Sequence, residues 1–352
     1  MNDQQAKDAI DSLIKKARVH LYKPIQIAEI LYRDRTEGDI DLASLETYRT
    51  RSKRWRDDVC IRFLGRASTS SAKFQDNIFE GNAIPPEVLS HLGAINRANN
   101  GIVEAYIYRR FQERMSQMSS GLDYCKQHDE KTFSLQEFLN LFWHEPGLRR
   151  SIDKIYEIVV YSLFSALVEA IGVTIEVSMN PDKDDILQEF EDFAKLVIRL
   201  SSECHSFKID AKIHRVGVTN ASDRGLDMFA NFGLAIQIKH LSLTEELAED
   251  IAHSVSADRI VIVCKDSEQK LIVSLLTQIG WKAKIQSIIT ESNLLTWYEK
   301  ALRGKYSTEL GSVVLSNINS EIQLEFPTTD NKDFLFFMGE RDYLSLKNMF
   351  WK

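Results

Sequence analysis

The stretch from Gly225 to His240, GLDMFANFGLAIQIKH, constrains the fold more than any other, because it predicts two apolar strands around a glycine-bearing turn. We interpret Asn231-Phe232-Gly233 as a three-residue hairpin loop in which the glycine takes the left-handed conformation. Symmetry about this loop predicts three cross-strand pairs: Ala230 with Leu234, Met228 with Ile236, and Asp227 with Gln237. The chain therefore contains a sheet, and a sheet needs apolar segments to cover it.

Such segments surround the hairpin in the sequence from residue 151 onward. A helix that is apolar on nearly every side, SIDKIYEIVVYSLFSALVEAIG, precedes an alternating strand, VTIEVSM, and a second helix, NPDKDDILQEFEDFAKLVIRLS. After the hairpin come a helix, TEELAEDIAHSVSA, a buried strand, RIVIVCK, and another helix, SEQKLIVSLLTQIG. This order predicts an α/β fold in which helices cover both faces of a small mixed sheet. The second helix has one apolar stripe: Ile186, Leu187, Phe190, Phe193 and Val197.

The first 150 residues are predicted to be mainly helical. Two helices are expected to meet near Lys23-Pro24, because the residue before a proline is disfavoured in a helix. A loop and short helix follow in EGNAIPPEVLSHLGAINRANNG, and a longer helix in GIVEAYIYRRFQERM. The segment 311–352, with IQLEF and DFLFFMGERDY, is expected to form strands and a short helix.

Composition excludes several classes of protein. The 44% of hydrophobic residues indicates a folded chain, and the net charge of -7 excludes a surface that is basic throughout. Four separated cysteines without a C-x-x-C pair favour a reducing cytoplasm over a disulfide or zinc framework. No secretory signal or membrane span is predicted, since the longest uncharged run, IVVYSLFSALV, is too short. No phosphate-binding glycine loop is present, so no nucleotide cofactor is expected.

Three polar residues interrupt the apolar hairpin. Side chains alternate across a strand, so Asp227, Gln237 and Lys239 are predicted to share one face. A carboxylate, an amide oxygen and an ammonium group in one neighbourhood could hold a divalent metal ion beside a phosphate, which suits phosphodiester hydrolysis. The alternative is a half-exposed hairpin whose polar face has no catalytic role.

The context of these residues resembles a known enzyme superfamily. The element order is similar to the αβββαβ core of the PD-(D/E)xK nucleases. More narrowly, VGVTNASDRGLDMFANFGLAIQIKHLSL resembles the type II restriction endonucleases of the HaeII family. The stretches KKARVHLYKPIQIAEILYRDR and KIYEIVVYSLFSALVEAIGV are similar to that family too, so the resemblance covers most of the chain.

The resemblance implies roles for the three residues and a Mg2+ cofactor. Asp227 would be the metal-binding acid, Gln237 would take the position usually held by Glu or Asp, and Lys239 would be the catalytic lysine. A neutral amide attracts a metal ion less than a carboxylate does, so another acid is expected to supplement it. Glu157, in the apolar helix, is the main candidate, with a solvated helix edge as the alternative, and Asp223 is a weaker one.

A basic cluster lies in the N-terminal region, with Trp55 among its members. We expect it to contact DNA phosphates and guanine edges, although a solvated helix face would have the same composition. Its residues are Arg49, Arg51, Lys53, Arg54, Arg56, Arg62 and Arg66. Arg109, Arg110 and Arg114 form a second, weaker patch.

Taken as a member of this family, the chain is expected to be a cytoplasmic bacterial type II restriction endonuclease that cuts double-stranded DNA. The resemblance implies the site purine-GCGC-pyrimidine, and a palindromic site implies a homodimer. Residues 1–150 would recognise DNA, 151–310 would form the nuclease core, and 311–352 would be a C-terminal extension. Two alternatives stay open: a repair or junction nuclease on the same core, and a DNA-binding protein with a decayed nuclease core.

Overall fold

The computed structural model describes residues 1–17, 20–67, 77–79, 83–144, 152–216, 226–239, 259–270, 273–274, 285–325 and 331–351. These residues form two compact units. The first is built mainly from Met1–Ile158 and Ile318–Lys352, and the second from Val159–Val216 and Arg224–Asn317. Helices α8 (Ile152–Ile171) and α14 (Ser307–Glu325) contribute residues to both units.

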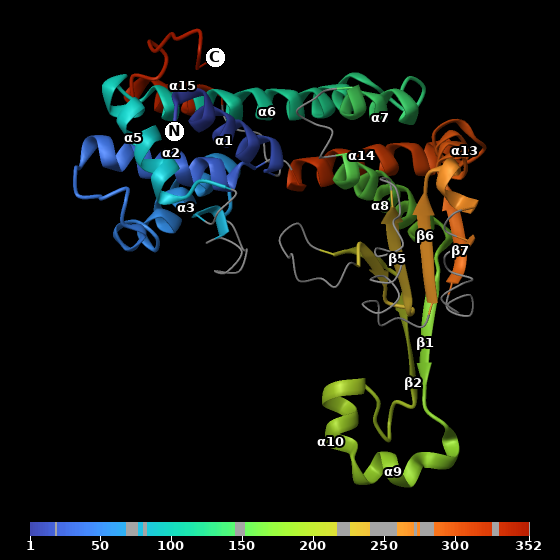
Figure 1. Ribbon diagram of the computed structural model, residues 1–352. Helices are drawn as coiled ribbons and strands as arrows, with labels where there is room; N and C mark the ends of the chain where they lie inside the picture. The colour runs from blue at the N-terminus through green and yellow to red at the C-terminus, as the bar shows by residue number, and fades with distance from the viewer. Residues whose placement is uncertain are drawn as a thin grey trace. The chain divides into compact units, whose positions relative to one another are not determined.

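The first unit is helical (Figure 1). Its further α-helices are α1 (Asp3–Lys16), α2 (Tyr22–Thr36), α3 (Arg51–Leu64), α5 (Pro86–Ala98), α6 (Ile102–Gln127), α7 (Leu135–His144) and α15 (Asn331–Glu340). Two short 3-10 helices are η1 (Leu45–Thr47) and η2 (Asn77–Phe79). The break between the first two helices falls before Tyr22, at Leu21 with a φ of 47°. Pro24 lies instead in the first turn of α2, where its missing N–H group costs no hydrogen bond.

The C-terminal part of the chain is helical, so the prediction of strands there was wrong. IQLEF begins at Ile322, inside α14, whose residues Val314, Ile318 and Ile322 are fully buried. Their spacing of four residues is the period of one helix face, and it outweighs the short alternation that suggested a strand.

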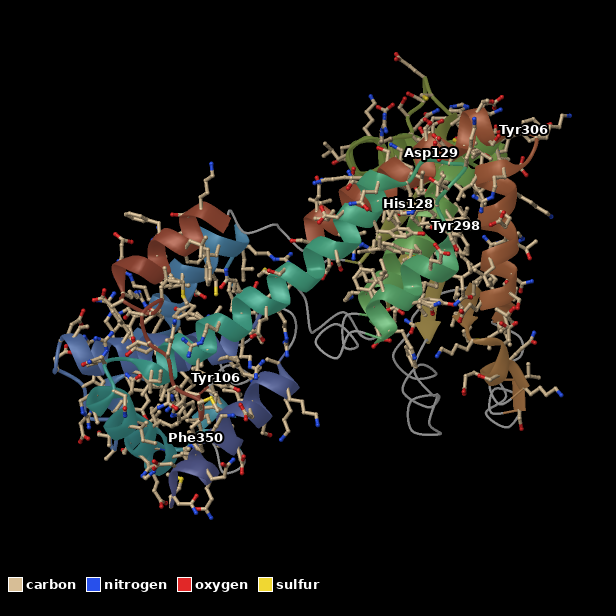
Figure 2. All side chains as sticks on the ribbon, turned by 90° about the horizontal axis from the view of Figure 1, so that it is seen from above. Tyr106, His128, Asp129, Tyr298, Tyr306 and Phe350 are labelled. Carbon is tan, nitrogen blue, oxygen red and sulfur yellow. The ribbon has the colours of Figure 1, made fainter. Side chains whose placement is uncertain are left out.

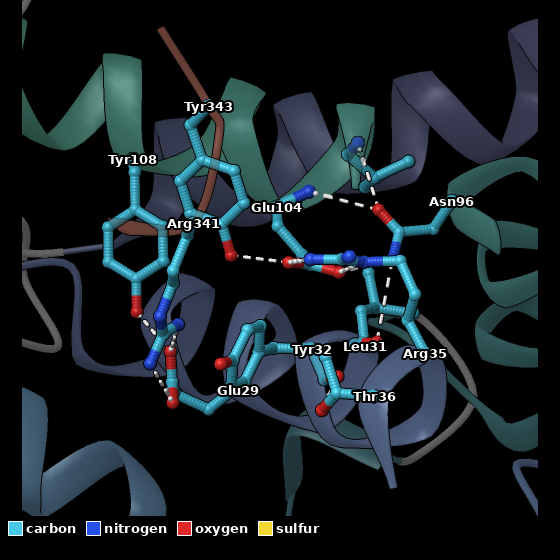
Figure 3. A network of polar contacts seen from close by, with 11 residues as sticks. Glu29, Leu31, Tyr32, Arg35, Thr36, Asn96, Glu104, Tyr108, Arg341 and Tyr343 are labelled. Carbon is cyan, nitrogen blue, oxygen red and sulfur yellow. Dashed lines mark hydrogen bonds and ion pairs between the residues drawn. The ribbon is translucent and has the colours of Figure 1, made fainter. Parts of the chain in front are cut away.

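A buried polar network joins this C-terminal part to the N-terminal helices (Figure 3). The Arg341 guanidinium, just after α15, donates to both carboxylate oxygens of Glu29 on α2, at 2.5 and 3.1 Å. The Tyr108 hydroxyl also donates to Glu29, at 2.5 Å. Glu104 on α6 accepts two bonds from Arg35, both 3.0 Å, and one from the Tyr343 hydroxyl. Every charge in the network therefore has a partner, as burial requires.

The last residues of the chain pack against α6. Arg109 donates to the main-chain oxygens of Leu346 at 3.2 Å and of Trp351 at 2.9 Å. The Trp351 ring lies edge-on to the Tyr106 ring at 5.5 Å and to the Phe350 ring at 5.5 Å. Figure 2 shows Tyr106 and Phe350 in the same helical body. Both ends of the chain thus belong to one folded body.

The second unit contains a five-stranded mixed sheet, which confirms the predicted α/β class. Its strands, in spatial as well as chain order, are β3 (Ile213–Arg215), β4 (Met228–Ala230), β5 (Leu234–Lys239), β6 (Arg259–Cys264) and β7 (Ile285–Thr290). The first two neighbouring pairs are antiparallel, and the last two are parallel. Strand β6 is the predicted RIVIVC strand, and its last five residues are buried.

Two helices of this unit contact one another. The Tyr298 hydroxyl, on α13 (Glu291–Arg303), donates to the Val159 main-chain oxygen of α8 at 2.7 Å (Figure 2). The rings of Phe164 and Trp297 lie 6.1 Å apart across the same pair. The predicted apolar helix is thus confirmed as α8, and residues such as Val160 and Leu163 are fully buried.

The strand predicted after Gly172 lies outside the main sheet. Strand β1 (Thr174–Ser178) pairs antiparallel with β2 (Ser206–Asp210) in a separate two-stranded ribbon. Between them the predicted single helix is replaced by short segments: η3 (Pro181–Lys183), α9 (Asp184–Glu189), α10 (Glu191–Phe193) and the π-helix η4 (Ala194–Ile198). We call residues 174–210 the arm and residues 181–198 its tip; Figure 1 shows α9 and α10 at the far end of the ribbon.

Two further predictions cannot be compared with the structure. The helix expected in TEELAEDIAHSVSA lies outside the described residues. Most of the helix expected in SEQKLIVSLLTQIG does so too, and its described start includes the 3-10 helix η5 (Asp266–Glu268).

Candidate active site

The hairpin that carries the candidate residues forms as predicted. Met228 pairs with Ile236 and Ala230 with Leu234. Gly233 has a φ of 84°, and its N–H group closes the turn on the Ala230 main-chain oxygen at 3.1 Å. The left-handed conformation explains why a glycine stands there, since other residues rarely adopt it.

Asp227 immediately precedes β4 and is fixed on both sides. Its main-chain oxygen accepts a hydrogen bond from Val216 at 2.9 Å, which continues the pairing of β3 with β4. Its carboxylate Oδ2 accepts the main-chain N–H group of Ile238 at 2.7 Å. A short bond from an amide to a charged oxygen is among the stronger hydrogen bonds. The carboxylate is therefore held against β5 between Gln237 and Lys239.

Gln237 lies on the central strand β5 and is fully buried. One step beyond the Met228–Ile236 pair, the antiparallel register sets Gln237 opposite Asp227. On the other side Gln237 is in register with Ile262 of β6. Burying an amide costs free energy, so an apolar residue would be more stable at this position if packing were its only role.

Lys239 is the last residue of β5, two positions after Gln237 and in register with Cys264. Its side chain lies outside the described part of the structure, as do Asp223, Gly225 and His240. Its catalytic role stays a prediction.

Glu157 lies on α8 and is 5% exposed. The Lys154 ammonium, one turn earlier, donates to both of its carboxylate oxygens, at 2.8 and 2.6 Å. The glutamate is therefore buried and balanced by a cation rather than lying at a solvated helix edge. Glu157 belongs to the first unit and Asp227 to the second, so its role as a metal ligand stays a prediction.

A ring pair on the same face of the sheet was not identified from the sequence. His214 on β3 is in register with Phe229 on β4, and their rings stack at 5.1 Å with an interplanar angle of 28°. Phe229 is two residues from Asp227, so the two share a face. Phe229 lies on a strand of the sheet, yet its side chain is 42% exposed to solvent. Strand β3 has only three residues, too few for a periodic pattern to reveal it.

The donor set at the hairpin fits a hard divalent cation. Asp227 and Gln237 offer a carboxylate and an amide oxygen from adjacent strands. A magnesium ion is commonly bound by one or two carboxylates, with water and substrate phosphate completing the shell. Among the described residues no three His, Cys, Asp or Glu side chains are grouped to hold a metal ion.

The basic cluster lies on and around α3, and most of its cations bind within the protein. Arg51 pairs with Asp39 at 2.6 Å, Arg62 with Asp333 at 2.5 Å, and Arg49 with Glu46 at 3.6 Å. Arg66 donates to the Glu325 main-chain oxygen at 2.7 Å. The ion pairs at the surface contribute little to stability, so a DNA phosphate can replace the carboxylate in each of them.

The remaining members differ in burial. Arg56 is 1% exposed and donates to Gln26 at 3.1 Å and to Asp57 at 2.7 Å, which indicates a structural role. Lys53 is half-buried, whereas Arg54 is exposed on the outer face of α3. In the weaker second patch, Arg114 donates to main-chain oxygens at the C-terminal end of α1, a structural contact of a cation with the helix dipole.

Comparisons with known proteins identify the family of this chain. The profile of the HaeII restriction endonuclease family matches residues 6–343. The chain is 63% identical to the type II restriction enzyme HaeII of Haemophilus aegyptius over 97% of its own length and 98% of that protein's. It is 60% identical to the type II restriction enzyme NgoBI of Neisseria gonorrhoeae, over 97% of each. No solved structure matches the chain.

The chain is thus a type II restriction endonuclease, a site-specific deoxyribonuclease whose substrate is DNA. Within that class it belongs to the HaeII restriction endonuclease family. Enzymes of this class generally use divalent metal ions, which agrees with the oxygen donors at the hairpin. None of the described helices is both long and apolar enough to cross a membrane.

Proposed function

We propose that this enzyme cuts both strands of DNA at a short palindromic site in a Mg2+-dependent reaction on a PD-(D/E)xK core. By the family resemblance the site is purine-GCGC-pyrimidine. The observation that carries the proposal is the Asp227 carboxylate, held by the Ile238 amide at 2.7 Å beside the buried Gln237.

The sheet supports the proposed core. The hairpin β4–β5 is followed by the parallel strand β6, and the acid and the amide stand on adjacent strands of it. This matches the arrangement that the family resemblance implies for the metal-binding acid and the residue two positions before the lysine.

Each residue has a proposed task. Asp227 and Gln237 would hold Mg2+, with Glu157 as the proposed third ligand. The bound ion would supply positive charge that offsets the charge on the scissile phosphate and the leaving oxygen. The Ile238 amide fixes the direction of the Asp227 carboxylate, and Lys239 would orient or deprotonate the attacking water. His214 and Phe229 would position the DNA beside the acid, since stacked rings offer a planar surface to sugar or base.

The basic cluster is proposed to contact DNA, and burial orders its members. Arg54 is exposed, and the pairs of Arg49, Arg51 and Arg62 lie at the surface, so these cations can reach phosphate. A GC-rich site calls for arginine or lysine donors to guanine O6 and N7. Arg56 would act by holding α3 in place.

A symmetric site cut on both strands supports a homodimer with one catalytic centre per strand. We place the enzyme in the bacterial cytoplasm. All four cysteines are free, as in proteins of a reducing compartment.

Digestion of a sequenced plasmid with and without Mg2+ tests the proposal. We expect discrete fragments whose ends map to one short palindrome and which require the metal ion. Lys239→Ala is expected to abolish cleavage while leaving binding to the site largely intact, as measured by gel shift. Lys300→Ala, an exposed lysine near the end of α13, is the matched control and should cut normally. A Lys239→Ala enzyme that cuts at the wild-type rate would refute the assignment.

A further inference from the structure

The arm carries apolar side chains that no described residue of its own unit covers. Six large apolar side chains at or near the tip are between 40% and 84% exposed. They are Ile186, Phe190, Phe193, Leu196, Val197 and Ile198. Among residues 181–200, only Ala194 and Leu200 are buried. Four of the six exposed side chains, Ile186, Phe190, Phe193 and Val197, belong to the stripe that the sequence predicted for one face of a helix.

The conformation of the tip is nonetheless set by specific contacts. Glu191 accepts from the Ser202 main-chain N–H group at 3.1 Å and from its hydroxyl at 2.5 Å, and it pairs with Lys195 at 3.3 Å. The Leu200 N–H group donates to the Ala194 main-chain oxygen at 3.2 Å. The exposed side chains therefore sit on a defined surface.

The ribbon below the tip also needs a cover. Ile175 is paired with Ile209, and Val177 with Phe207, so the ribbon has one apolar face that is only half-buried. A two-stranded antiparallel ribbon alone is marginally stable in water. Such an arm is typical of an element that packs on another folded surface.

Charge argues against DNA as that surface. Between Asn180 and Glu203 the acidic residues outnumber the basic ones by seven to three. The acids are Asp182, Asp184, Asp185, Glu189, Glu191, Asp192 and Glu203, and the bases are Lys183, Lys195 and Arg199. Neighbouring phosphates would repel this surface, since DNA binding depends on neutralising cations.

The exposed area fits a second copy of the chain. A large apolar side chain has roughly 150–200 Å² of surface, so six that are a little over half exposed present about 600 Å². Patches of this size mark interaction sites, and two of them together bury about 1,200 Å², the lower end of the range of roughly 1,200–2,000 Å² for specific interfaces. Two arms related by a twofold axis would supply the same patch from both sides, because a symmetric dimer contact uses one surface twice.

We propose that the arm tip is the dimerisation surface of this enzyme, with the arm of one copy packed against the arm of a second. The inference rests on the proposed homodimer and names its interface. It also gives the inserted segment between β1 and β2 a function apart from catalysis.

The test compares two exposed side chains changed in the same way. Leu196→Glu alters the tip, where Leu196 is 84% exposed, and Met349→Glu is the matched control at 83% exposure in the other unit. We expect sedimentation to show dimers for the wild type and for Met349→Glu. Leu196→Glu should dissociate at least about 100-fold more readily, because each dimer would lose two apolar contacts and bury two charges. Circular dichroism should show that the variant keeps its helical content.

Energy transfer between labelled copies is a second measurement. Cys204 is exposed at the arm. Burial raises the pKa of Cys125 to about 12 and of Cys264 to about 11, and raises that of Cys60 further, so maleimide dyes at neutral pH should label Cys204 first. Donor-labelled and acceptor-labelled copies should transfer energy when mixed, and Leu196→Glu should abolish the transfer.

Three results would overturn the proposal: a Leu196→Glu enzyme as dimeric as the wild type, one that stays dimeric but loses DNA affinity, or a wild type that is monomeric at micromolar concentration. Plasmid cleavage by the wild type is scored separately. A dimer that dissociates through Leu196→Glu but cuts no DNA would support the interface while refuting the proposed reaction.

Discussion

The buried pair of Arg341 and Glu29 leads to a quantitative prediction about stability. Arg341→Met removes both bonds from the guanidinium and leaves the Glu29 carboxylate buried with the Tyr108 hydroxyl still bonded to it. Breaking a buried pair by removing one partner costs about 3–5 kcal/mol. Methionine keeps much of the packing against the Tyr32 ring, which the guanidinium contacts at 3.7 Å.

The second partner supplies the control for this number. Glu29→Leu/Arg341→Met removes both charges and leaves only the Tyr108 hydroxyl short of an acceptor, which costs about 1–3 kcal/mol. The double variant should therefore be more stable than Arg341→Met alone. Arg51→Met breaks a pair whose two side chains are about half exposed, so it should change stability by less than about 1 kcal/mol.

Urea unfolding followed by circular dichroism measures these free energies by linear extrapolation. The reasoning would be refuted by an Arg341→Met protein within about 1 kcal/mol of the wild type, or by a double variant whose loss equals the sum of the two single losses.

Three further outcomes follow from the structure. Burial raises the pKa of Tyr108 and Tyr343 well above their usual 10, so an unfolded chain releases these two protons at a lower pH than the folded protein does. The free energy of unfolding should therefore be full below pH 10 and fall above it by about 1.4 kcal/mol per pH unit for each tyrosine. Tyr343→Phe should make this fall less steep in urea titrations at pH 9 to 11. Asp227→Asn keeps the shape of the site but removes its charge, so the rate of single-turnover cleavage should fall by at least about 1000-fold. Gln237→Glu adds a charge and should lower the Mg2+ concentration that gives half-maximal cleavage. Wild-type behaviour of either variant would contradict the metal assignment. Arg54→Ala should reduce the slope of the logarithm of the DNA-binding constant against the logarithm of salt concentration by about 1, without changing the melting temperature of the protein. An unchanged slope would show that Arg54 does not contact DNA.

The parts of the fold that could be predicted are those coded locally. Gly233 and the alternation around it specify the hairpin, and the unbroken apolar pattern of α8 specifies a buried helix. The arm could not be predicted, because the stripe from Phe190 to Val197 has the same period whether it covers its own sheet or another chain. Strand β3 was missed because three residues carry no period.

The candidate site divides in the same way. The register that sets Asp227 beside Gln237 follows from the loop length and was predicted. Counting charges could not separate Arg54, which is exposed, from Arg56, which is buried, because their difference is set by Gln26 on another helix. The stacking of His214 on Phe229 depends on a pairing between strands that sequence spacing does not reveal.

The closure of the first unit by both ends of the chain has a consequence for biosynthesis. Glu29 leaves the ribosome long before its cationic partner, because Arg341 lies 312 residues later in the chain. A nascent or prematurely terminated chain therefore lacks the contacts that complete the helical body carrying the basic cluster. The pair of Glu29 and Arg341 therefore cannot form until residue 341 has been synthesised, and until then the helical body lacks one of its buried ion pairs.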